Sequence, residues 1–66
     1  MRLTVNGEIH ELHGLVTLGE LLAAMNVSSQ RLAVELNGEV LNPDQYETTK
    51  LSEGDRLELV RFVGGG

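Results

Sequence analysis

Apolar and polar residues alternate along three segments of the chain, which is the pattern of a strand with one buried face. The segments cover residues 1–5, 31–36 and 56–62. Their inward residues are Met1, Leu3, Val5, Leu32, Val34, Leu36, Leu57 and Leu59. We therefore predict one strand for each segment.

An Asn-Gly pair follows each of the first two segments, and both residue types accept the positive φ of a tight hairpin turn. The two pairs are Asn6-Gly7 and Asn37-Gly38. Residues 8–12 and 39–41 are then the returning strands. The apolar positions Ile9 and Leu12 break strict alternation, which predicts a bulge or an early end of that strand.

A single helix is predicted to begin at Thr17, which is a favourable N-cap and forms a capping box with Glu20. Val16 and Leu21 occupy the two positions of a hydrophobic staple around this cap. Residues spaced as i, i+3, i+4 and i+7 share its apolar face, namely Leu18, Leu21, Leu22 and Met25. Asn26 is suited to end the helix in the left-handed conformation.

Residues 42–51 contain the one proline and show no period, so we expect a loop with one helical turn near Asp44, Gln45 and Tyr46. A turn over residues 52–55 then leads into the last strand. The resulting order places one helix on one face of a mixed sheet of four to five strands. This is an α+β protein with the β-grasp arrangement, in one domain over residues 1–66, with residues 63–66 as a flexible tail.

The composition narrows the functional classes. Ten acidic residues stand against five basic ones in 66 residues, and tyrosine and phenylalanine occur once each. Nucleic-acid binding requires basic and commonly aromatic residues, so we expect none. No apolar stretch is long enough to span a membrane and no signal peptide is visible, so the expected location is the cytoplasm. The acidity suits a soluble protein that docks on a basic partner.

Three consecutive glycines, Gly64, Gly65 and Gly66, follow the last alternating segment. Glycines form a thin, flexible segment that fits a narrow slot and, fully extended, reaches roughly 10 Å. The distinctive group in this segment is the terminal carboxylate of Gly66. Conversion to an acyl-adenylate would give this carboxylate a good leaving group, and attack by sulfur would then yield a thiocarboxylate. The alternative is a frayed terminus or an engineered remnant.

An apolar docking patch is expected on the strand that precedes these glycines. Val60 and Phe62 should face away from Leu57 and Leu59, beside Ala33 if the third and last strands pair. We interpret the three outward residues as a surface for a partner protein. The alternative is that a neighbouring loop covers them in part.

Other groups of polar side chains do not indicate a metal site or a catalytic site. His10 and His13 have no cysteine or third ligand with them, so we expect no metal. The acidic residues between positions 44 and 55 do not follow the EF-hand pattern. Ser28 and Ser29 have no partnered base. The chain is therefore not expected to be an enzyme or to hold a cofactor.

The whole chain resembles the sulfur carrier proteins of thiamine biosynthesis, the ThiS family, which are ubiquitin-like β-grasp domains. The resemblance rests on the segments Val5-Asn6-Gly7-Glu8, Ala33-Val34-Glu35-Leu36-Asn37-Gly38-Glu39-Val40, Gly54-Asp55-Arg56-Leu57-Glu58-Leu59-Val60 and Phe62-Val63-Gly64-Gly65-Gly66. It implies an E1-like adenylyltransferase that uses ATP, a cysteine desulfurase relay that supplies sulfur, and thiazole synthase as acceptor.

Three other functions remain open at this stage. The small subunit of molybdopterin synthase shares the fold and the tail, although that family is usually longer. A ubiquitin-like modifier would use the same acyl-adenylate at Gly66 and differ only in its acceptor, a lysine. A passive β-grasp binding module would not use the glycines at all.

Overall fold

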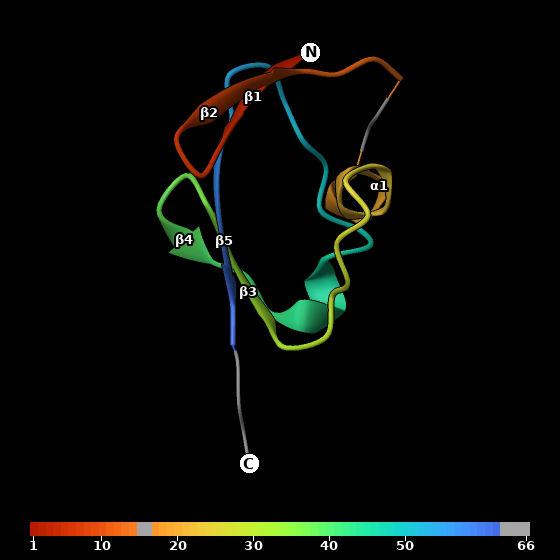
Figure 1. Cartoon of the computed structure of the whole chain (residues 1–66), viewed down its shortest axis with the longest axis vertical. Coiled ribbons are helices and arrows are strands. Elements are labelled where there is room, and N and C mark those ends of the chain that lie inside the picture. The colour runs from red at the N-terminus through yellow and green to blue at the C-terminus, as the bar shows by residue number, and fades with distance from the viewer. Residues whose placement is uncertain (15–16, 63–66) are drawn as a thin grey trace.

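The computed structural model describes residues 1–14 and 17–62, which form a five-stranded sheet with a helix on one face (Figure 1). The elements are β1 (Arg2–Val5), β2 (Glu8–Glu11), α1 (Leu18–Ala24), β3 (Leu32–Leu36), β4 (Glu39–Val40), the 3₁₀ turn η1 (Pro43–Gln45) and β5 (Arg56–Arg61). The strand order is β2-β1-β5-β3-β4. The α+β arrangement predicted from the sequence, a mixed sheet packed on one helix, is confirmed.

Strand β5 lies in the centre of the sheet, where it joins the first and second halves of the chain. It pairs in parallel with β1, with Val5 opposite Leu57, and antiparallel with β3, with Val34 opposite Leu59. β1 ends at Val5, and the Asn6 side chain then continues the pairing. The N–H of Leu59 donates to Asn6 Oδ1 at 2.7 Å, and Asn6 Nδ2 donates to the Leu59 carbonyl oxygen at 3.3 Å.

Both predicted hairpin turns are confirmed, because their four central residues have positive φ. The angles are 49° and 82° for Asn6 and Gly7, and 51° and 88° for Asn37 and Gly38. Such values give the turn a twist that matches the right-handed twist of the flanking strands.

The strand ends differ slightly from the sequence prediction. β2 stops at Glu11, so the predicted early end is observed, and Ile9 is exposed while Leu12 packs against the core. β3 begins at Leu32, because Arg31 has a φ of 56° and cannot continue a strand. β4 ends one residue before Leu41.

The predicted start of α1 is confirmed by its capping box. The N–H of Glu20 donates to Thr17 Oγ1 at 3.2 Å, and the N–H of Thr17 donates to Glu20 Oε1 at 2.9 Å. Asn26 has a φ of 59°, as expected of a residue that ends a helix in the left-handed conformation. The staple predicted for Val16 lies outside the described residues.

The core lies between α1 and the sheet. The helix residues that face the core are those predicted from the sequence. The buried core residues are Leu3, Val5, Leu18, Leu21, Leu22, Leu32, Val34, Tyr46, Leu51 and Leu57, with Met25 partly buried against them. The sequence analysis missed Tyr46 and Leu51, because they lie in a connecting segment without a period. The hydroxyl of buried Tyr46 donates to the Leu32 carbonyl oxygen at 2.8 Å.

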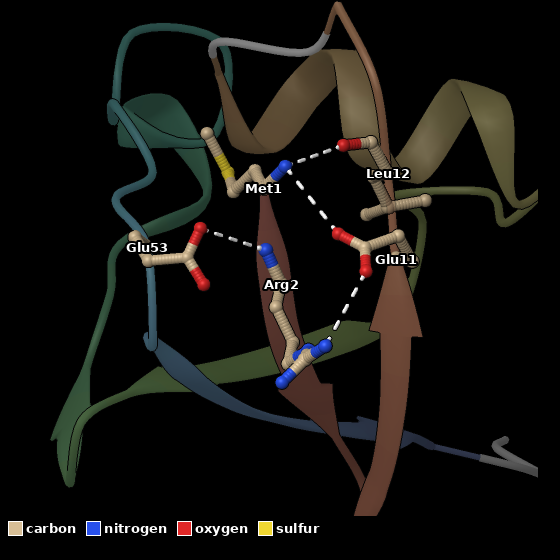
Figure 2. Close-up of polar contacts among 5 residues, drawn as sticks. All are labelled: Met1, Arg2, Glu11, Leu12 and Glu53. Atoms are coloured by element: carbon tan, nitrogen blue, oxygen red, sulfur yellow. Dashed lines mark hydrogen bonds and ion pairs between the residues drawn. The ribbon is translucent and has the colours of Figure 1, made fainter.

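Polar contacts fasten the start of β1 to its neighbours (Figure 2). The Met1 ammonium donates to the Leu12 carbonyl oxygen at 2.8 Å and lies 3.8 Å from Glu11 Oε2. Arg2 Nη2 lies 3.6 Å from Glu11 Oε1, and the Arg2 N–H donates to Glu53 Oε1 at 3.1 Å. These contacts connect β1 both to β2 and to the turn that precedes β5.

Replacing Leu21 by alanine should lower the free energy of unfolding by about 2–5 kcal/mol, because Leu21 is fully buried and the substitution leaves a cavity. Chemical denaturation measures the loss. Thr17→Ala serves as the comparison, with an expected loss of about 1 kcal/mol from the missing cap. An unchanged midpoint for Leu21→Ala would contradict the packing of α1.

Replacing Asn6 by glycine should weaken the attachment of β5, because glycine retains the positive φ but removes both side-chain bonds to Leu59. The expected loss of stability is about 1–3 kcal/mol. Hydrogen exchange of the Leu59 amide should accelerate more than that of the Phe62 amide, which donates to the Arg31 carbonyl oxygen instead. Equal acceleration at both amides would show that Asn6 does not hold β5 locally.

Candidate functional site

The predicted reactive residues Gly64, Gly65 and Gly66 lie outside the described residues, whereas the strand that precedes them is described. β5 is held on both sides, by β1 and by β3, and Phe62 follows it directly. The N–H of Phe62 still donates to the Arg31 carbonyl oxygen at 2.8 Å. The chain is therefore hydrogen-bonded as far as Phe62, first to β3 and then to Arg31, the residue that precedes β3.

The predicted docking residues lie together on the sheet face opposite α1. Ala33 and Val60 are directly paired between β3 and β5, as expected. Val60 and Phe62 are 54% and 59% exposed, while Leu57 on the other face is fully buried. We refer to Ala33, Val60 and Phe62 as the outer apolar surface. Its position is confirmed, and its role in docking remains a prediction.

Two glutamates and one further apolar residue lie beside the outer apolar surface. Glu35 pairs with Glu58 across β3 and β5 and with Val40 across β3 and β4, so the three share the outer face of the sheet. Val40 is 73% exposed. Val40 was not predicted from the sequence as a surface residue, although a short strand after a turn is a signal for an exposed edge. The outer face thus combines apolar side chains with adjacent carboxylates, which suits an apolar partner surface with basic residues around it.

The described residues show no grouping that could hold a metal. His10 Nε2 lies 4.0 Å from Glu8 Oε1, and no third ligand joins His10 and His13. Across residues 1–14 and 17–62, no three His, Cys, Asp or Glu side chains gather at one point. Within the same residues, no helix has the length and apolar character needed to cross a membrane.

The sheet order and the single helix on one face define a small β-grasp domain. Comparison with known proteins identifies the family to which this domain belongs. Residues 3–66 match the model of the ThiS family. The chain therefore belongs to the ThiS family of sulfur carrier proteins.

Three relatives illustrate the match. A crystal structure of the thiamine biosynthesis protein ThiS from Geobacter metallireducens superposes with a TM-score of 0.84, at 40% identity and with both chains fully covered. The sulfur carrier protein ThiS of Bacillus subtilis is 36% identical over 50 residues, which is 76% of each chain. A thiazole synthase from Paramagnetospirillum magneticum is 38% identical over all 66 residues of this chain. The chain spans only 20% of the length of that thiazole synthase.

Proposed function

We propose that this chain carries sulfur for thiamine biosynthesis as a thiocarboxylate on Gly66. The observation that carries the proposal is the match to the ThiS family through residue 66, the third of the three glycines. The central strand β5 supports it as well, because a rigid strand directly before this segment would present it to a partner.

The chemistry takes place in two steps on the carboxyl group of Gly66. A carboxylate oxygen attacks the α-phosphorus of ATP, so that pyrophosphate leaves and an acyl-adenylate forms. A sulfur nucleophile at the oxidation level of sulfide then attacks the acyl carbon and displaces AMP, which leaves the thiocarboxylate. The chain contains no cysteine, so both the sulfur and the catalytic groups come from partners. The chain itself is the substrate that is carried, and it is not the catalyst.

The resemblance to the ThiS family implies three partners for this scheme. An E1-like adenylyltransferase would bind ATP and activate Gly66, and thiazole synthase would accept the sulfur. A cysteine desulfurase relay would carry the sulfur as a persulfide, and a thiol reductant would release it at the oxidation level of sulfide while itself forming a disulfide. The similarity to a segment of a longer chain named thiazole synthase supports thiazole synthase as a partner, because a region similar to this domain belongs to the same polypeptide there.

The outer apolar surface is the proposed docking site for the activating enzyme and for the sulfur acceptor. Phe62 precedes Gly66 by four residues, so docking at Phe62 would confine the carboxylate within at most about 14 Å. Such confinement converts part of the binding energy into positioning of the reacting group. Gly64 and Gly65 would pass through a narrow slot because they have no side chains.

Deleting Gly66 should abolish ATP–pyrophosphate exchange by the activating enzyme, because the carboxylate would then end one residue short of the α-phosphate. The unfolding midpoint should stay the same, and this is the control for folding. Wild-type exchange by the shortened chain would overturn the assignment of Gly66. A stable adduct of the full chain on lysines, with no thiocarboxylate, would instead indicate a protein modifier.

Replacing Phe62 by aspartate should weaken binding to the activating enzyme by about thirtyfold, as expected for the loss of one central apolar contact of about 2 kcal/mol. Calorimetric titration measures the affinity. Ile9→Asp is the matched control, because Ile9 is 69% exposed on the same face but at the far edge of the sheet. Equal affinity for Phe62→Asp and wild type would exclude this face, and unfolding of the variant would contradict the observed exposure of Phe62.

A further inference from the structure

A groove of about 280 Å³ opens on the helix-facing side of the sheet, away from the outer apolar surface. Its apolar lining comes from Val5, Leu32 and Leu59 on the sheet and from Met25 and Val27 at the end of α1. Glu8 and His10, both on the edge strand β2, line it as well, whereas the cationic Arg61 lines it from β5, which β1 separates from β2. The groove therefore lies next to the edge of the sheet and has room for an aliphatic side chain.

Within residues 1–14 and 17–62, no strand pairs with the outward backbone groups of β2 at this edge. Leu12 and Met1 exchange backbone bonds at 2.8 Å, so Leu12 points its N–H and C=O towards β1. In an antiparallel pair, alternate residues point the same way. His10 and Glu8 therefore also bond to β1, whereas Ile9 and Glu11 point their N–H and C=O groups away from the sheet. β2 is the outermost strand on this side of the described sheet.

The carboxylates along β2 differ in their surroundings. Glu11 lies 3.6 Å from Arg2 and 3.8 Å from the Met1 ammonium, so its charge is compensated within the chain (Figure 2). Glu8 is 83% exposed and, among residues 1–14 and 17–62, has only the distant His10 as an ion-pair partner, at 4.0 Å. Glu8 is therefore the carboxylate on the groove side that can accept a cation from outside.

We propose that β2 and the groove bind an extended basic segment of a partner protein, which adds to the sheet as a strand beside β2. The main chain of this segment bonds to the outward groups of Ile9 and Glu11. Its side chain opposite His10 is aliphatic and enters the groove, and its side chain opposite Glu8 is a lysine or arginine. Two such positions, two residues apart, fall on the same face of a strand.

Charge decides between this occupant and a second copy of the chain. Charged residues on an edge strand normally prevent it from pairing with copies of itself. Two copies would bring Glu8 and Glu11 of one chain close to those of the other, and each chain has a net charge of −5. A basic segment would instead be attracted by Glu8, whose charge is not compensated by Arg2 or Met1. Because β1 separates β2 from β5, this segment would leave Val60 and Phe62 uncovered.

The test is an NMR titration of the ¹⁵N-labelled chain with a blocked synthetic peptide of repeating Lys-Thr-Ile-Thr, which places lysine and isoleucine two residues apart on one face of a strand, at physiological ionic strength. We expect saturable shifts at Ile9, Glu11, Met25 and Val27, together with slower hydrogen exchange of the Ile9 and Glu11 amides. A peptide with glutamate in place of lysine, and one with N-methylated alternate residues, should not bind. Shifts centred on Val60 and Phe62, equal binding of the control peptides or the absence of saturable binding would overturn the proposal.

Two substitutions on β2 locate the contacts, and a third is the control. Ile9→Pro removes one outward N–H without touching the bonds to β1, and proline is tolerated at such an edge position. It should weaken binding about three- to tenfold, whereas Ile9→Thr keeps the N–H and should bind as wild type. Glu8→Lys should weaken binding at least threefold. If Ile9→Pro does not fold, Glu8→Lys and the N-methylated peptide decide. Wild-type affinity for both of these would overturn the proposal.

Discussion

The parallel ladder between β1 and β5 closes this domain, because it joins the first strand of the chain to the last. The ladder is short, with two pairs of opposed residues. Backbone bonds extend it at both ends, from the Thr4 N–H to the Asp55 carbonyl oxygen at 3.0 Å and from the Asn6 N–H to the Leu57 carbonyl oxygen at 2.9 Å. The Asn6 side chain then carries the pairing on to Leu59. This arrangement places β5 in the middle of the sheet, where it completes the core on one face and presents Val60 on the other.

A domain of this size buries a modest share of its surface, and the described residues contain no metal grouping to supplement the core. Stability therefore depends on aliphatic packing of α1 against the sheet. That packing uses only one sheet face, which leaves the other face for partners. In the function that we propose, the domain acts as a rigid base, and the reacting group follows its central strand. Specificity would then depend on docking, because in this function the partner proteins supply the catalytic groups.

Local signals in the sequence predicted most of the fold. Alternation assigned β1, β3 and β5, and the Asn-Gly pairs and the capping box located the two hairpins and the start of α1. A period of two also fixes the face of each residue, which explains why Val60 and Phe62 could be placed on the outer face before the structure was known. Burial of Tyr46 and Leu51 could not be predicted, because it depends on a loop that packs against distant elements. The side-chain hydrogen bonds from Asn6 to the Leu59 backbone also could not be predicted from the sequence, because 53 positions separate the two residues.

Intact-mass spectrometry can detect whether this chain carries sulfur on Gly66, as we propose. The chain would be incubated with its activating enzyme, ATP and a sulfur donor, and its mass compared with that of a sample without ATP. We expect an ATP-dependent increase in mass equal to the replacement of one oxygen by sulfur, and fragmentation should assign the change to Gly66. An unchanged mass under conditions in which the enzyme releases pyrophosphate, or a change assigned to another residue, would contradict the proposal.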